Sequence, residues 1–291
     1  LCLPYLPGDA SLTLITRWFA DMMSHLNQIH WSPDAERAGV SLLSAYILFE
    51  EETFEPSFFA DALVNYRNLT KKELSMFPPI YKSGVFITSY LAEGKKYLPY
   101  LLNKFKELGG KVIQKRVNDL KELVGQYDIV VNCTGVEAFN LVNDNKVKPV
   151  RGQVFRVSAP WIKHAVMTAN HYILLNSDSV VLGGTKQVGD WNREVNPEDS
   201  KNIMDNCCDI YPSLRSAQII REWVGLRPGR EETRIETEVI NPNGFRDKLY
   251  VVHNYGHGGS GVTLFWGCAQ EVLVLVNDII DRLKVNKLSK L

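Results

Sequence analysis

The sequence predicts an α/β fold in which amphipathic helices alternate with two kinds of strand. Three observations support this class. Apolar residues of Ser11–Ile29 recur at helical spacing. Two short apolar runs, Lys111–Gln114 and Ile129–Asn132, suit buried parallel strands. After Arg151, runs of β-branched and aromatic residues alternate with turn residues, which is typical of antiparallel strands.

Each element of the first half follows from its local pattern. Leu14, Trp18 and Leu26 form one apolar helix face, and Gly109-Gly110 ends a later helix because glycine readily adopts the left-handed conformation of a helix end. The expected order is a helix at Ser11–Ile29, strands at Ser41–Phe49 and Tyr81–Thr88, a helix at Tyr97–Leu108, and the two parallel strands.

The second half is expected to form most of the antiparallel sheet and to end on a helix. The expected order is strands at Gln153–Val157, Tyr172–Leu175 and Val180–Gly183, a helix containing Ile203 and Cys207, strands at Ile219–Leu226, Thr233–Ile240 and Leu249–His253, and a closing helix at Cys268–Leu283.

Composition excludes several classes of protein. With 45% apolar and 23% charged residues the chain is typical of folded globular domains, not of disordered ones. The 33 basic and 33 acidic residues cancel, and no basic cluster is interleaved with aromatic residues, so nucleic acid is not an expected partner. No apolar run approaches the roughly 18 residues of a membrane span. The five cysteines form no CxxC pair and are expected to be reduced thiols.

The stretch Asn254–Thr263 contains four glycines and precedes the closing apolar helix. Glycines let the backbone adopt positive φ and approach a ligand closely, and the amides at a helix N-terminus favour an anion or an electron-rich ring. A tight connection gives the same pattern, so this stretch alone does not establish a ligand site.

Four further motifs precede that stretch: Ile129–Val136, Pro149–Gln153, Gly183–Trp191 and Gly225–Pro228. In this order the five motifs resemble the family of D-amino acid oxidases and D-aspartate oxidases, which are FAD-dependent flavoproteins. The resemblance extends from Leu1 to the end of the chain.

The resemblance implies an FAD-binding Rossmann-like domain and a substrate domain built on a mixed antiparallel sheet, both discontinuous in sequence. The substrate domain would comprise residues 1–92 and 151–227, and the FAD-binding domain residues 93–150 and 228–291. The family opens with a β-α-β unit whose GxGxxG turn holds the FAD pyrophosphate. We find no such motif, so we expect this sequence to lack that unit, about the first fifty residues.

The resemblance also assigns the residues that bind substrate. Arg227 would hold the substrate α-carboxylate, since a guanidinium binds a carboxylate through two parallel hydrogen bonds. Tyr172 would assist it, and backbone atoms of Gly259 would contact the substrate amine. Two alternatives stay open: a surface ion pair of Arg227 with Glu222 or Glu236, and a role for Tyr172 as an aromatic residue of a sheet core.

The FAD contacts implied by the resemblance are mostly backbone contacts, because the protein orients the flavin and the flavin supplies the chemistry. His253 and His257 are four residues apart but lie in a glycine turn and not on a helix, so no metal site is expected. The implied FAD-binding residues are Leu1, Val117, Cys133, Thr134, Gly258, Gly261, Val262 and Thr263.

Different motifs predict different preferences for the substrate side chain. D-aspartate oxidases carry a basic residue where this chain has Lys186, whose ammonium keeps the charge but not the two-pronged geometry of arginine. At the opposite wall Tyr5 matches the neutral-substrate oxidases, whereas Leu3 is aliphatic, as in the aspartate enzymes. We weight Lys186 most, because charge beside a substrate carboxylate changes affinity more than a methyl group does.

A second basic residue of the aspartate oxidases is not evident. Met167 stands near its place, and Lys163 or His171 could substitute for it. The neutral-substrate alternative therefore stays open.

The chain ends in Ser289-Lys290-Leu291, the address that import receptors of the peroxisome recognise. We therefore expect a protein of the peroxisomal matrix with the import receptor as a partner. The oligomeric state is not indicated.

The resulting hypothesis is a peroxisomal oxidase that transfers hydride from Cα of a D-amino acid, preferably an acidic one such as D-aspartate, to flavin N5. An imine would hydrolyse to a 2-oxo acid and ammonia, and oxygen would be reduced to hydrogen peroxide. The alternatives are an oxidase of neutral D-amino acids and a shortened, non-catalytic product that cannot hold FAD.

Overall fold

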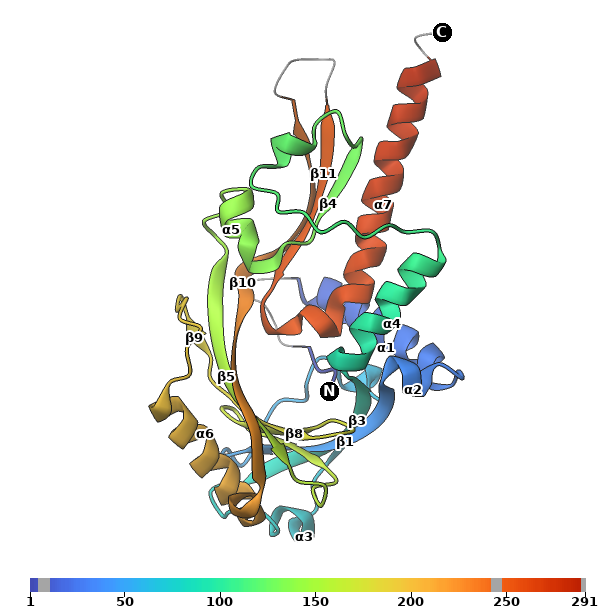
Figure 1. Cartoon of the computed structure of the whole chain (residues 1–291). Coiled ribbons are helices and arrows are strands. Elements are labelled where there is room, and N and C mark those ends of the chain that lie inside the picture. The colour runs from blue at the N-terminus through green and yellow to red at the C-terminus, as the bar shows by residue number, and fades with distance from the viewer. Residues whose placement is uncertain (5–10, 242–247, 289–291) are drawn as a thin grey trace. The chain divides into compact units, whose positions relative to one another are not determined.

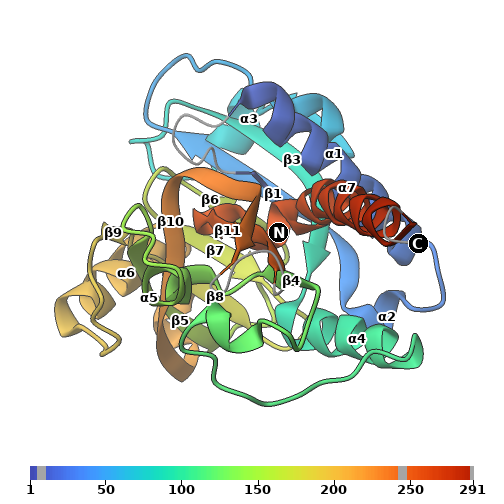
Figure 2. The same cartoon turned by 90° about the horizontal axis from the view of Figure 1, so that it is seen from above.

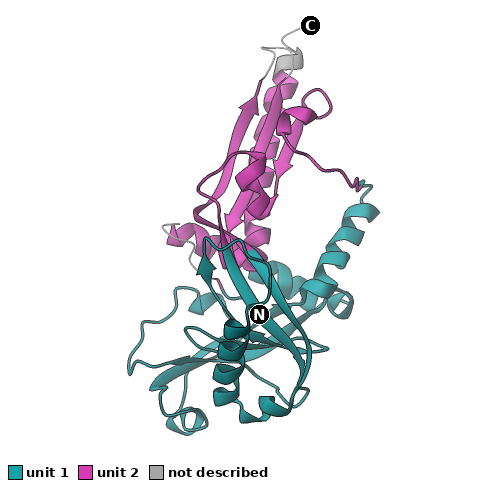
Figure 3. Ribbon diagram, turned by 60° about the vertical axis from the view of Figure 1, so that its left-hand side comes forward, with its two compact units in different colours: residues 1–3, 23–111, 150–226 teal, residues 4–22, 112–149, 227–291 magenta. Residues whose placement is uncertain are grey.

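The predicted mixed α/β fold is present in the computed structural model, which describes residues 1–4, 11–241 and 248–288 (Figure 1). The chain forms two compact units, each described below by itself (Figure 3). The first unit comprises residues 1–3, 23–111 and 150–226, and the second comprises residues 4–22, 112–149 and 227–291.

These units differ from the predicted domains at two helices. Helix α4 (Gly94–Glu107) belongs to the first unit because it packs beside α2 (Ala35–Ala38), where the Tyr100 hydroxyl donates to Asp34 (Figure 2). The first part of α1 (Leu12–His30) belongs to the second unit, where Arg17 pairs with Glu271. Which unit binds which ligand stays a prediction.

The first unit is built on a sheet in the order β2-β3-β1-β6-β7-β8-β5, with β9 also paired to β5. Its strand pairs are antiparallel except β1 with β6, in agreement with the sequence pattern after Arg151. The strands are β1 (Val40–Phe49), β2 (Asn65–Asn68), β3 (Ser83–Ala92), β5 (Lys148–Ser158), β6 (Ala165–Met167), β7 (Tyr172–Leu175), β8 (Val180–Gly183) and β9 (Gln187–Val188).

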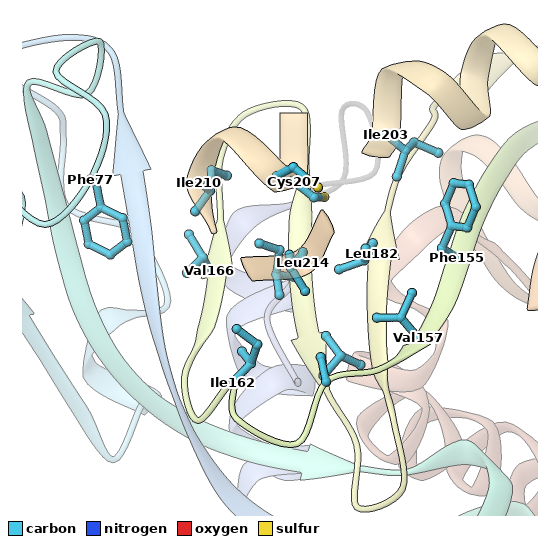
Figure 4. Close-up of a cluster of buried hydrophobic side chains, with 14 of the residues drawn as sticks. Phe77, Phe155, Val157, Ile162, Val166, Leu182, Ile203, Cys207, Ile210 and Leu214 are labelled. Carbon is cyan, nitrogen blue, oxygen red and sulfur yellow. The ribbon is translucent and has the colours of Figure 1, made fainter. Parts of the chain in front are cut away.

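Helix α6 (Pro197–Ile210) covers the core of this unit. Its first turn is capped by Asn196, whose side chain accepts from two backbone amides, and Pro197 suits the first helical position. Ile203 and Cys207 of α6 face apolar residues of β5, β6 and β8 in one buried cluster (Figure 4). A short α3 (Lys71–Leu74) and the 3₁₀ turns Ala60–Ala62 and Pro212–Ser216 complete the unit.

In the second unit, β11 (Leu249–His257) lies between β4 (Ile129–Asn132) and the part of β10 (Gln218–Ile240) that begins at Arg227. The earlier residues of β10 belong to the first unit. β4 runs parallel to β11, as predicted, but it is not buried as predicted, since Val131 is 42% exposed. β10 runs antiparallel to β11. The long helix α7 (Gly261–Leu288) packs on the sheet through Val272 and Ile279. The short elements are α5 (Ala138–Leu141) and the 3₁₀ turns Leu120–Leu123, Gly135–Glu137 and Gly258–Ser260.

Two strand predictions were wrong. Lys111–Gln114 forms no strand and Ile113 is 70% exposed, because no strand among the described residues pairs with it. The two strands predicted on either side of Gly225–Pro228 are one strand, β10. Its pairing with β11 begins at Gly229 and shifts register between Gly229 and Arg234. Pro228 lies before the first residue that pairs with β11, so its missing amide costs that pairing no hydrogen bond.

One feature of α7 was not anticipated. By length and composition the stretch Gly258–Val285 could cross a membrane. The sequence did not predict this, because each uninterrupted apolar run in it is much shorter than a membrane span. One such helix is weak support for a membrane span, since a helix that packs on a sheet meets the same criterion.

Candidate active site

The glycine-rich motif connects β11 to α7. The strand continues through Asn254 to His257, beyond its predicted end, and the turn Gly258–Ser260 then leads into the helix. Gly256 and Gly258 have φ of 89° and 56°, which L-residues rarely adopt. The prediction that these glycines allow positive φ is confirmed at these two positions.

The backbone of this turn is open. Among the described residues, no heavy atom lies within 4 Å of a Cβ built on Gly258, and the nearest atom to one built on Gly259 is Cδ of Arg227, at 3.9 Å. The structure therefore brings Arg227 and Gly259 together, the two residues assigned to the substrate carboxylate and amine. Arg227 lies on β10, directly before Pro228.

Two buried polar atoms of the same motif lack a partner among the described residues. Oδ1 of Asn254 and Nε2 of His257 are buried and accept or donate no hydrogen bond within the described protein. Burial also lowers the pKa of His257 to about 4, so its imidazole is neutral at physiological pH. Because buried polar groups in proteins normally have partners, these two atoms are open to a polar ligand or a water molecule.

A second segment reaches this edge of the sheet. His253 of β11 pairs in register with Asn132 at the end of the parallel strand β4, so Cys133 and Thr134 follow β4 at the edge where ligands of parallel sheets bind. The Asn254 side chain also hydrogen-bonds the Cys133 thiol. The predicted FAD-binding pair thus lies beside the glycine-rich motif.

A chain of hydrogen bonds that was not predicted from the sequence sets the conformation of Cys133 and Thr134. Asn132 Oδ1 accepts from the amide and hydroxyl of Thr134, at 3.2 and 2.7 Å, and its Nδ2 donates to Nδ1 of His253. Nε2–H of His253 then donates to Glu238 at 3.0 Å, and burial lowers the pKa of His253. In the sequence, the only sign of this role was that the polar residue Asn132 follows the apolar run Ile129–Val131.

The other predicted FAD-binding residues of the second unit lie in different settings. Gly261, Val262 and Thr263 open α7, where Val262 is exposed and Thr263 is buried. The Val117 side chain packs against the cluster of Leu120 and Leu123.

Tyr172 lies in the first unit, on β7, directly between Met167 of β6 and Gly183 of β8. A Cβ added to Gly183 would lie 2.3 Å from the Tyr172 ring, and one added to Gly184 would lie 2.8 Å from its hydroxyl oxygen. The two glycines therefore leave the space that the ring fills. Met167 is the cross-strand neighbour of Tyr172 on β6.

Lys186 is exposed in the segment between β8 and β9, three residues after Gly183. Of the candidates for a second basic residue, His171 bonds Asn202 of α6 at 2.9 Å, and Lys163 lines a separate cavity of about 220 Å³ beside the β7–β8 turn. His171 directly precedes Tyr172 in the chain, whereas Lys163 lies at that separate cavity.

Leu1 and Leu3 pack partly buried against the cluster around Leu91 in the first unit. The segment is fixed by Cys2, whose amide donates to the carbonyl of Tyr90. Tyr5 and the terminal tripeptide Ser289-Lys290-Leu291 lie outside the described residues.

The residues at the carboxyl edge of the second unit fit FAD. The open glycine backbone, the N-terminus of the long helix α7 and the unpaired atoms of Asn254 and His257 are what a flavin nucleotide requires of a protein surface. Cys133, Thr134, Gly258 and Gly261–Thr263 would hold it there. Among the described residues, no group of His, Cys, Asp and Glu could hold a metal ion.

Comparison with known proteins identifies the family. The FAD dependent oxidoreductase family matches residues 7–273. A D-aspartate oxidase of Homo sapiens is 40% identical over 287 residues, which cover 98% of this chain and 83% of that protein. A D-amino acid oxidase of Dugesia ryukyuensis is 41% identical over 286 residues, which cover 97% of this chain and 85% of that protein. The structure of glycine oxidase from Bacillus cereus has a TM-score of 0.69 at 16% identity and covers 95% of this chain and 83% of its own, which shows a shared fold. This chain therefore belongs to the FAD-dependent oxidoreductase family, together with these D-aspartate and D-amino acid oxidases.

Proposed function

We propose that this oxidoreductase converts D-amino acids, preferably acidic ones such as D-aspartate, to 2-oxo acids, ammonia and hydrogen peroxide, with oxygen as the electron acceptor. The observation that carries the proposal is the position of Arg227 beside the open backbone of Gly259, at a glycine-rich edge that fits FAD. The names of the two relatives above, at 40% and 41% identity, support the choice of D-amino acids.

The protein's own groups bind and orient the substrate. Arg227 would hold the α-carboxylate through two N–H donors, which fixes two atoms of the substrate and limits its rotation. A backbone atom of Gly259 would receive the amine, so that Cα–H has one orientation. The flavin supplies the two-electron oxidation when it is bound.

Lys186 supports the acidic preference. Its side chain is exposed and cationic, and it follows the glycines against which Tyr172 packs. A cation near the distal carboxylate of D-aspartate favours that substrate over D-alanine. Met167 beside Tyr172 supports the neutral alternative, because it places a thioether where a second cation would bind.

The substitution Lys186→Met separates the two. If Lys186 reads the distal carboxylate, kcat/KM for D-aspartate falls about tenfold, equivalent to about 1.4 kcal/mol, and kcat/KM for D-alanine stays within about twofold. Lys201→Met, at an exposed lysine of α6, is the matched control. An undiminished rate on D-aspartate in Lys186→Met would leave the neutral-substrate oxidase as the better proposal.

The activity itself is tested by purifying the protein with FAD and recording flavin absorbance and hydrogen peroxide release. D-aspartate, D-alanine and their L-enantiomers are the substrates. Bound flavin with release from a D-enantiomer alone is the expected result. Oxidation of the L-enantiomers contradicts the proposal, and protein that retains no flavin supports the non-catalytic alternative.

We also propose that Ser289-Lys290-Leu291 directs the protein into the peroxisomal matrix through the import receptor, because this tripeptide is a receptor-read address. A fluorescent protein that carries residues 280–291 at its C-terminus is expected to co-localise with a peroxisomal marker. The same fusion without Leu291 is expected to stay in the cytosol. Identical distributions of the two fusions would exclude this role.

A further inference from the structure

Arg151 of β5 is the largest fully buried side chain of the described chain, with 1% of it exposed. All five of its N–H donors have acceptors, three in side chains and two in backbone carbonyls. Nε donates to the carbonyl of Asn192 at 3.0 Å, Nη1 to Gln187 Oε1 at 2.6 Å and Asp199 Oδ2 at 2.7 Å, and Nη2 to Gln153 Oε1 at 2.9 Å and the carbonyl of Glu194 at 2.7 Å.

These acceptors lie in four segments of the first unit, of which one is the stretch between β9 and α6 that contains Asn192 and Glu194. Gln153 belongs to β5 and Asp199 to the first turn of α6, while Gln187 belongs to β9. Gln187 also donates to both carboxylate oxygens of Asp199, at 3.1 and 3.2 Å. The guanidinium of Arg151 therefore holds β9 against β5 and against the start of α6.

The short segment that precedes β9 carries Lys186. On one side of it, the Thr185 hydroxyl oxygen accepts from the amide of Gln153 at 2.9 Å. On the other, Gln187 lies opposite Arg151 in the β5–β9 register and bonds its guanidinium. The backbone of Lys186 is thus fixed on both sides, while its side chain remains exposed.

The same segment begins at the glycines that contact Tyr172. The position of the Lys186 backbone relative to the Tyr172 ring is consequently set by the hydrogen bonds of Thr185 to Gln153 and of Gln187 to Arg151. A buried ion pair contributes little net stability compared with apolar residues of the same volume, and its better-attested use is to specify one arrangement.

We propose that Arg151 is a positioning residue for substrate selectivity: it fixes the segment Gly184–Gln187 so that Lys186 favours an acidic substrate over a neutral one. The inference rests on the proposed function and extends it to a residue that touches neither substrate nor cofactor.

The test uses Arg151→Lys in the full-length, FAD-loaded protein. Lysine keeps the charge but has three donors on one atom, so it cannot reach the five acceptors of a planar guanidinium. The ratio of kcat/KM for D-aspartate to that for D-alanine is expected to fall about fivefold to tenfold, through a higher KM for D-aspartate, with kcat for D-alanine within about twofold. Arg156→Lys, on the same strand but bonded to Ser179, is the matched control and leaves the ratio unchanged.

A double-mutant cycle separates positioning from a general effect on folding. If Arg151 acts through Lys186, Arg151→Lys has no further effect on the ratio once Lys186→Met is present. Equal losses on both substrates, or a loss of the ratio that persists in the Lys186→Met background, overturn the proposal. Where Arg151→Lys fails to fold, Gln187→Met removes the same anchor from the other side and is expected to lower the ratio in the same way.

Hydrogen exchange gives a readout that needs no turnover. Amides of residues 184–188 are expected to exchange faster in Arg151→Lys than in Arg156→Lys, while those of α6 beyond its first turn are unchanged. If the wild-type protein oxidises neither substrate, the proposed function fails by itself. Exchange in this segment that is equal in the two variants removes the structural basis of the inference whatever the activity.

Discussion

Replacing Arg227 with methionine is expected to lower kcat/KM for the D-amino acid substrate by about a thousandfold, equivalent to about 4 kcal/mol. Truncating one partner of a hydrogen-bonded charge pair costs about 2–5 kcal/mol, because the second charge loses its partner in a desolvated site. Here the second charge is the α-carboxylate that every amino acid substrate carries. The loss is therefore expected for D-aspartate and D-alanine alike, unlike the selective effect of Lys186→Met.

The position of Arg227 supports so large an effect. Apart from the residues adjacent in the chain, its Cδ is the nearest described atom to a Cβ built on Gly259, and the alternative ion pairs with Glu222 or Glu236 stay open. Glu222 accepts a hydrogen bond from Ser200, and Glu236 pairs with Arg234 at 2.6 Å, so both carboxylates have other partners.

Steady-state kinetics of Arg227→Met and of Arg221→Met check this prediction. Arg221 is an exposed arginine on the same strand, so its substitution controls for the loss of a positive charge from β10. Flavin absorbance of both variants shows whether FAD is still bound. A loss below about tenfold in FAD-loaded Arg227→Met would place the carboxylate elsewhere.

The sequence predicted most elements because their patterns are local. The helix Ser11–Ile29 needs only its own apolar spacing, and it is present as α1. The segment Lys111–Gln114 shows the limit, because a strand requires a neighbour as well as an apolar run, and no described strand pairs with it. The Gly225–Pro228 motif was interpreted as the boundary between two strands, although it lies inside β10, before the residues that pair with β11.

The same difference separates the site residues that could be predicted from those that could not. Gly258 and Arg227 belong to short motifs, and their roles were predicted from the resemblance of those motifs to the oxidase family. The support from Asn132, His253 and Arg151 depends on partners that are distant in sequence: Asn132 and His253 are 121 residues apart. No periodicity marks such pairs, and a buried arginine or histidine cannot be told from an exposed one until the fold is known.

The second large effect concerns the packing of α1 on α7 in the second unit. Gly267→Ala is expected to destabilise the protein, although alanine in a helix interior is worth about 1 kcal/mol more than glycine. A Cβ on Gly267 would lie 2.3 Å from Cα and 2.7 Å from the carbonyl oxygen of Trp18, and these backbone atoms cannot rotate away. Overpacking of this kind costs about 1–3 kcal/mol or more, and the upper end applies when a whole helix has to move.

The net loss is expected to be about 2 kcal/mol, with a fall in Tm of about 4–8 °C. Gly94→Ala is the matched control, because a Cβ there meets no described atom within 4 Å and Gly94 is the first residue of α4. The control is expected to be neutral or slightly stabilising. Thermal unfolding of the two variants beside the wild type decides the matter: a Gly267→Ala protein as stable as Gly94→Ala would mean that α1 and α7 are not in close contact at Trp18.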